Sequence, residues 1–62
     1  MVSAVVVART KMDGLEYLAE GSDWTERAER AARFLNVREA TRVALRLPSR
    51  FKAFALPLHH AI

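Results

Sequence analysis

The side chains of this 62-residue chain that are spaced to do chemistry are mainly cationic. Three arginines recur every four residues, at Arg38, Arg42 and Arg46, and two further cations follow them, Arg50 and Lys52. Residues four apart share one face of a helix, so the arginines predict a single stripe. The later cations would complement the negative C-terminal end of that helix. Such a stripe suits an acidic protein surface or a row of phosphates, or is simply a solvated helix face.

Few other residues are placed for catalysis or metal binding. His59 and His60 are adjacent, and neighbours on a strand point to opposite faces, so they cannot share one metal ion. Glu16 and Glu20 are expected on the solvent side of a hairpin, where nothing would raise a carboxyl pKa. The sequence contains no nucleophile motif and no glycine-rich phosphate loop. It therefore predicts a protein that is not an enzyme and that uses no cofactor and no metal.

The length of the chain limits its core. A chain of 62 residues forms at most one domain and buries only about 60% of its unfolded surface. It has no cysteine, so no disulfide supports the core, and a homodimer is one remedy. The lack of cysteine fits a reducing, cytoplasmic location. The apolar run around residues 4–8 is too short for a signal peptide or a membrane span, and we expect no membrane partner.

Charge is divided unevenly along the chain. Residues 1–26 carry two cations against five carboxylates, a net charge of −3, while residues 27–62 carry eight against two, a net charge of +6. This division predicts an acidic and a basic face and favours charged partners or head-to-tail self-association. A protein partner is favoured over nucleic acid, because the acidic half would repel phosphates and no exposed aromatic residues for base stacking are evident.

A hairpin and a last strand are the sheet elements expected to position these residues. Residues 2–10 are rich in β-branched side chains, residues 15–21 read as the returning strand, and Asp13-Gly14 supplies the positive φ of a tight turn. Residues 51–56 alternate again, until Pro57 closes the strand. Because proline cannot donate to a ladder, this strand is expected at a sheet edge.

Residues 24–47 admit two interpretations. A single amphipathic helix would place five apolar side chains on one face, those of Trp24, Ala28, Ala31, Ala32 and Leu35. Alternatively, Asn36 is an N-cap with Glu39 three residues later, and a shorter helix runs from Val37 to about Leu47, where Pro48 stops it. The core side of this helix, opposite the arginines, is then expected to carry Val37, Ala40, Val43 and Leu47. In that case the residues before Asn36 form a bend with a short helix or a brief strand.

Five aromatic residues are more than so small a domain is expected to bury. Phe51 and Phe54 fall on opposite faces of the expected last strand, so one of them is a candidate for a partner or dimer interface. We select Phe54, with Leu56, because that side of the strand also carries Lys52. The predicted partner-binding residues are therefore Arg38, Arg42, Arg46, Arg50, Lys52 and Phe54.

About half of the chain carries a loose pattern of an aromatic-bearing second strand, a glycine, Trp-Thr, Ala-x-x-Phe and a capped helix with Glu-Ala. The residues of this pattern are Tyr17, Leu18, Trp24, Thr25, Ala31, Phe34, Glu39 and Ala40. It resembles small uncharacterised proteins encoded by phages and prophages of proteobacteria. The resemblance implies a bend and a short strand before Phe34, which favours the second interpretation of residues 24–47. The ending "LPLHHAI" departs from the charged, β-branched strand of that pattern.

The resemblance also implies a biological context. Small proteins of mobile elements often act by stoichiometric binding to host machinery, and anti-CRISPR proteins are among them, although they share no single fold. An inhibitor or adaptor of a host protein or ribonucleoprotein complex is therefore expected. The alternative is a nucleic-acid-binding accessory protein that uses the basic helix stripe. The expected fold is α+β, a small antiparallel sheet of three or four strands with one main helix across one face, in the order β-β-short element-α-β.

Overall fold

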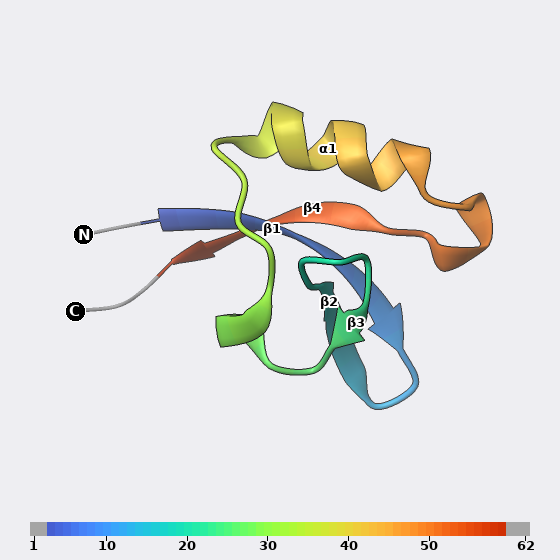
Figure 1. Cartoon of the computed structure of the whole chain (residues 1–62). Coiled ribbons are helices and arrows are strands. Elements are labelled where there is room, and N and C mark those ends of the chain that lie inside the picture. The colour runs from blue at the N-terminus through green and yellow to red at the C-terminus, as the bar shows by residue number, and fades with distance from the viewer. Residues whose placement is uncertain (1–2, 60–62) are drawn as a thin grey trace.

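The computed structural model describes residues 3–59 and shows a four-stranded antiparallel sheet with one main helix (Figure 1). The elements are β1 (Ser3–Lys11), β2 (Gly14–Leu18), β3 (Trp24–Thr25), the 3-10 turn η1 (Ala28–Arg30), the helix α1 (Val37–Arg46), the 3-10 turn η2 (Ser49–Phe51) and β4 (Phe54–His59). The strand order is β3-β2-β1-β4, and α1 packs across β1 and β4. The predicted α+β class and element order are confirmed.

The hairpin of β1 and β2 forms with its turn one residue earlier than predicted. Lys11 pairs with Gly14, so Met12 and Asp13 make the two-residue loop. Gly14 has a φ of +147°, a conformation that residues with a side chain rarely adopt. The glycine is therefore required at the first position of β2 and not within the turn itself.

The core lies between α1 and the sheet. Its buried residues are Val7 of β1, Leu18 of β2, and Ala40 and Ala44 of the helix. Small alanine side chains let α1 approach the strands closely, and Ala40 is fully buried. The other face of β1 is also buried, since Val6 has no exposed surface, and η1 lies on that side of β1 in Figure 1. Cover on both sides of β1 thus explains why the neighbouring Val6 and Val7, which point to opposite faces, are both fully buried.

Residues 24–36 do not continue the helix. After β3, the chain makes η1 and then forms isolated bridges at Ala31, with Ala19, and at Phe34, with Val5. The Phe34 N–H donates to the Val5 carbonyl at 2.9 Å, so this segment takes up hydrogen bonds of β1 beyond the part of that strand that pairs with β2. The interpretation with a bend and a short strand before Phe34 is confirmed, and the single long helix is wrong.

The helix α1 begins and ends at the predicted signals. The side-chain oxygen of Asn36 accepts a hydrogen bond from the Glu39 N–H at 2.9 Å, which satisfies one of the unpaired donors of the first turn. The helix ends at Arg46, two residues before Pro48. Val37 was expected in the core but is 49% exposed. Within residues 3–59, no helix combines the length and apolar character needed to cross a membrane.

The last strand starts later and ends later than predicted. Residues 49–51 form η2, so Phe51 is not part of β4, and its ring packs edge-on against Trp24 with the ring centroids 5.9 Å apart. The strand begins at Phe54 and continues through Pro57 to His59. The prediction that Pro57 closes the strand is therefore wrong.

The position of Pro57 explains why the strand tolerates it. β4 is an edge strand, as predicted, and Pro57 pairs with Val5 of β1. The Val5 carbonyl bonds to Phe34 on the opposite side, so the Val5–Pro57 pair makes no hydrogen bonds of its own. The backbone of Pro57 consequently points to the open edge, where a missing N–H costs no ladder bond and discourages pairing with another strand.

Candidate partner-binding surface

The three helical arginines lie together on the outer side of α1. Arg38, Arg42 and Arg46 are all exposed, while the buried side of the helix carries Ala40 and Ala44. At about 100° per residue, the arginines are centred on the side opposite these alanines. Arg50 and Lys52 are also exposed and follow the helix, in and just after η2.

Most of these cations lack a carboxylate partner. Arg42 Nη1 lies 3.7 Å from Glu39 Oε2, an exposed pair within one turn of the helix. Among the described residues, no ion pair engages the other four cations, Arg38, Arg46, Arg50 and Lys52. The guanidinium of Arg50 lies 5.1 Å from the ring centre of Phe51, which leaves its charge available at the surface. The helix and the turn after it therefore present a row of uncompensated positive charge.

A mainly apolar stripe, not anticipated from the sequence, runs beside the arginines, with the half-buried Thr41 at its centre. Val37, Thr41 and Leu45 also recur every four residues, each one position before an arginine, so the two stripes are parallel. Leu45 is 79% exposed, and Leu35, just before the helix, is 93% exposed. The four-residue spacing of positions 37, 41 and 45 is a sequence signal for this stripe, but the prediction that Val37 belongs to the core obscured it. Exposed apolar side chains bordered by cations are typical of protein interfaces.

A small pocket opens at the C-terminal end of α1. It has a volume of about 230 Å³ and is lined by Ala44, Leu45, Leu47, Pro48, Ser49, Lys52 and Ala53. Pockets for drug-sized ligands measure about 300–1,000 Å³, whereas an apolar cavity of about 150 Å³ admits benzene. The pocket is thus sized for a single apolar side chain. Because Leu45 belongs to its wall, the pocket is continuous with the apolar stripe.

The backbone at Lys52 is unusual for a lysine. Its φ of 53° and ψ of 41° are left-handed, and its N–H donates to the Ser49 carbonyl at 3.0 Å to close η2. A residue other than glycine in this conformation costs about 1 kcal/mol or more. Lysine at this position therefore places an ammonium group at the pocket at a cost in stability.

Phe54 lies apart from this surface. In the sheet register Ala8 pairs with Phe54 on one side and with Tyr17 on the other, so these rings flank Ala8 on the face turned away from α1. Phe54 is 37% exposed. Lys52 precedes the strand and borders the pocket beside the helix, so the expected grouping of Phe54 with Lys52 is wrong. Strand alternation cannot be applied to a residue in a turn.

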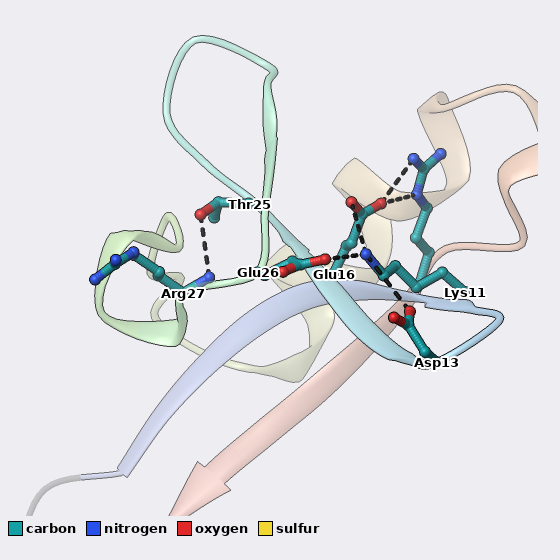
Figure 2. A network of polar contacts seen from close by, with 7 residues as sticks. Lys11, Asp13, Glu16, Thr25, Glu26 and Arg27 are labelled. Atoms are coloured by element: carbon teal, nitrogen blue, oxygen red, sulfur yellow. Dashed lines mark hydrogen bonds and ion pairs between the residues drawn. The ribbon is translucent and has the colours of Figure 1, made fainter.

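A second group of charges gathers at the β1–β2 hairpin, and in it the cations are paired (Figure 2). Arg9 donates from Nε and Nη2 to Glu16 Oε1 at 3.0 and 2.8 Å. Lys11 Nζ bonds to Glu26 and lies 3.6 Å from Asp13 Oδ1 and 3.9 Å from Glu16 Oε2. The hydrogen bond to Glu26 raises the pKa of Lys11 above its ordinary value; the three carboxylate charges act in the same direction, and burial acts against them.

The guanidinium of Arg9 is also stacked on aromatic rings. Its central carbon lies 4.3 Å from the ring centre of Trp24 and 5.0 Å from that of Phe51. Glu16 was expected on the solvent side of the hairpin, but it pairs across the strands with Arg9 on the helix side, and its side chain is only 19% exposed. This cluster therefore binds together β1, β2, β3 and η2, and its charges are satisfied internally.

Within residues 3–59, no group of three or more His, Cys, Asp or Glu side chains gathers to hold a metal ion. His60 lies outside the described residues, and His59 is described only as the last residue of β4. No family model, no curated protein and no solved structure matches the chain. Function is therefore inferred from the surface of this chain.

Proposed function

We propose that this chain is a non-enzymatic binding protein that docks a partner protein on the outer surface of α1. The supporting observation is the pair of parallel stripes. One is of exposed arginines, of which only Arg42 has a carboxylate partner among the described residues, and the other carries the exposed apolar side chains of Val37 and Leu45. Protein interfaces combine an apolar centre with a charged rim, and this surface offers both side by side. Nucleic acid would use the cations and gain little from an exposed leucine.

The position of Arg38 supports a role in binding. It lies in the first turn of α1, whose N-terminal end carries partial positive charge. A cation there is unfavourable by about 0.3–1 kcal/mol, and among the described residues no carboxylate pairs with Arg38. Glutamate at the same position would stabilise the helix. An arginine at this unfavourable position is consistent with a role in binding a partner protein.

The resemblance to phage and prophage proteins supplies the biological part of the proposal. The chain acts in the cytoplasm of a bacterial host as a stoichiometric inhibitor or adaptor of host machinery, and an anti-CRISPR-type inhibitor is its most concrete form. Its target is a host protein or ribonucleoprotein complex with an acidic docking surface. Such a role needs no catalytic group, only a stable and complementary surface.

A nucleic-acid-binding accessory protein is the second candidate, favoured by the length of the cationic row. Arg38, Arg42 and Arg46 continue into Arg50 and Lys52, so five cations could follow a phosphate backbone. Such binding would be indifferent to sequence and would weaken steeply with salt. It would not depend on the apolar stripe, and this separates the two candidates.

The test is capture of partners from a bacterial host lysate by two matched variants. One carries Arg38→Glu, Arg42→Glu and Arg46→Glu on α1; the other carries Arg27→Glu, Arg30→Glu and Arg33→Glu in and beside η1. Both sets are exposed, and both variants have the same net charge. Each lysate is used with and without nuclease.

Capture of a protein that survives nuclease, is retained by the η1 variant and is lost by the α1 variant is the expected result. Equal loss in both variants would mean that total charge attracts the partner, which contradicts a docking surface on α1. Capture that disappears with nuclease would transfer the assignment to nucleic acid binding.

A further inference from the structure

We propose that the partner presents an acidic segment with one large apolar side chain, which enters the pocket at the end of α1 while its carboxylates pair with the arginine stripe. This rests on the proposed function and specifies its partner. Ordinary docking on a charged helix would need no pocket. The pocket, its cationic border and the conformation of Lys52 carry the inference.

The pocket offers an apolar site for one anchoring residue. Its walls are mainly apolar, with Leu45, Leu47 and Ala53 among them, and its volume of about 230 Å³ accommodates a leucine or phenylalanine side chain. Leu45 is largely exposed where it borders the pocket, so part of the anchor would also cover this side chain. Interfaces commonly gain most of their affinity from one such buried residue surrounded by weaker contacts.

The charges at the border of the pocket determine which partner residues can flank the apolar side chain that enters it. Among residues 3–59, Lys52 is the only ionisable residue that lines the pocket. Arg46 lies between two lining residues in the chain, and Arg50 directly follows a third. No carboxylate of the described part of the chain lines the pocket. An apolar residue flanked by Asp or Glu is therefore complementary to it, and one flanked by Lys or Arg is disfavoured.

The geometry of the helix sets the spacing of the acidic residues. Arg38 and Arg46 are eight residues apart, or about 12 Å along the helix axis at 1.5 Å per residue. Carboxylates at positions i, i+4 and i+8 of a partner helix, or spread over about four residues of an extended strand, span the same distance. The apolar anchor belongs at one end of this acidic run, because the pocket lies at one end of α1.

Lys52 allows stability and binding to be separated. Lys52→Gly removes the left-handed strain and should stabilise the fold, while it removes the cation from the pocket. Ser49→Phe fills the pocket with a side chain and leaves every charge in place, and Ser49 is exposed, so the fold should tolerate it. Arg30→Glu, on η1, is the charge control, and it lowers the net charge by two, twice the change made by Lys52→Gly.

The experiment selects binders from a random 12-residue peptide library displayed against the wild-type chain. The strongest peptide is then titrated by fluorescence anisotropy against wild type and the three variants. Selected peptides should share a leucine or aromatic residue at one end of a run with two or more Asp or Glu. Ser49→Phe and alanine at the peptide anchor should each weaken binding at least tenfold, with little further loss when combined. Lys52→Gly should weaken binding a few-fold while raising the melting temperature, and Arg30→Glu should change binding less than twofold.

Several outcomes would overturn the inference. Peptides that bind the wild type but are indifferent to Ser49→Phe and to loss of their apolar residue would remove the pocket from the interface, while the proposed function would stand on the capture experiment. Selection of basic peptides, or of no peptide at all, would contradict the proposal that the partner presents an acidic segment. Self-association of the wild type that Met12→Glu abolishes would assign the pocket to the exposed hairpin tip of a second copy.

Discussion

The hairpin cluster and the outer surface of α1 use the same charged side chains to opposite effect. At the hairpin, Arg9 and Lys11 are bonded to carboxylates, and Arg9 is also stacked on two aromatic rings. On α1, Arg38 and Arg46 have no acidic partner among the described residues. Sheet register placed Glu16 opposite Arg9, and the chain after β3 brings Glu26 to Lys11, whereas the outer side of the helix faces only solvent. What distinguishes the two regions is whether their cations are paired, rather than how many they carry. Paired cations at the hairpin stabilise the fold, and the unpaired cations of α1 are available to a partner.

The largest expected effect tests the stabilising role of the hairpin cluster. Arg9→Ala removes two hydrogen bonds to Glu16 and the stacking on Trp24 and Phe51, and leaves the largely buried Glu16 carboxylate with the more distant Lys11, at 3.9 Å, as its cation. It should lower the free energy of unfolding by about 2 kcal/mol or more. Urea unfolding followed by fluorescence of Trp24, the single tryptophan, measures it. Arg42→Ala is the control and should change stability by less than about 0.5 kcal/mol. Similar losses of unfolding free energy in the two variants would contradict the distinction between the hairpin cluster and the outer surface of α1.

Removing the helix cap should have a smaller effect on stability and almost none on the pocket. Asn36→Ala deletes the hydrogen bond to the Glu39 N–H and should cost about 1 kcal/mol in the free energy of unfolding. Asn36→Ser keeps a capping oxygen and should retain most of that stability. The pocket lies at the other end of α1, so affinity for the selected peptide should change less than twofold. A tenfold loss of affinity would place the binding surface at the helix N-terminus instead.

The two ends of the arginine stripe should respond with opposite signs. Arg38→Gln should raise the free energy of unfolding by about 0.3–0.5 kcal/mol, because it removes a cation from the positive end of the helix. Arg46→Gln removes a cation from the last turn and should lower it by a similar amount. Thermal melting of the two variants and of the wild type at low salt measures both changes in stability. Destabilisation by both would show that Arg38 has an intramolecular role after all.

The smallest expected effect concerns the pH dependence of the hairpin. The pKa of Lys11 is raised in the folded chain, mainly by its hydrogen bond to Glu26. Its stabilising contribution is therefore complete below the unfolded lysine pKa of about 10.4 and disappears as the pH rises through the higher folded pKa. The stability difference between wild type and Lys11→Met should shrink over that range and also shrink in high salt. A difference that grows above pH 10 would contradict this assignment.

Local signals predicted most of the elements. The β-branched run of β1, the glycine after the turn, the cap at Asn36 and the stop before Pro48 all act through neighbours a few residues away. Such interactions are visible in sequence because their geometry is nearly independent of the rest of the fold. The arginine stripe was predictable for the same reason, since helical periodicity alone places its members together.

Several errors arose where distant segments meet. Phe51 lies outside β4 and packs against Trp24. The left-handed residue Lys52 interrupts the predicted strand, so alternation counted from Phe51 does not apply to β4, in which Phe54 faces away from the helix. Glu16 lies on the helix side because it shares a face of β2 with the buried Leu18, and the register then sets Arg9 opposite it. Neither contact leaves a periodic trace in the sequence.

By itself the sequence determined that this chain forms a small α+β domain, where its helix begins and ends, and that the helix carries a row of arginines on one side. Only the tertiary structure decided which charges are neutralised, which apolar residues stay exposed and where a pocket opens. The physical reason is that capping, turns and periodicity depend on residues a few positions apart. Charge pairing and pockets instead depend on strand register and on the packing of segments such as β1, α1 and η2 that lie far apart in the chain.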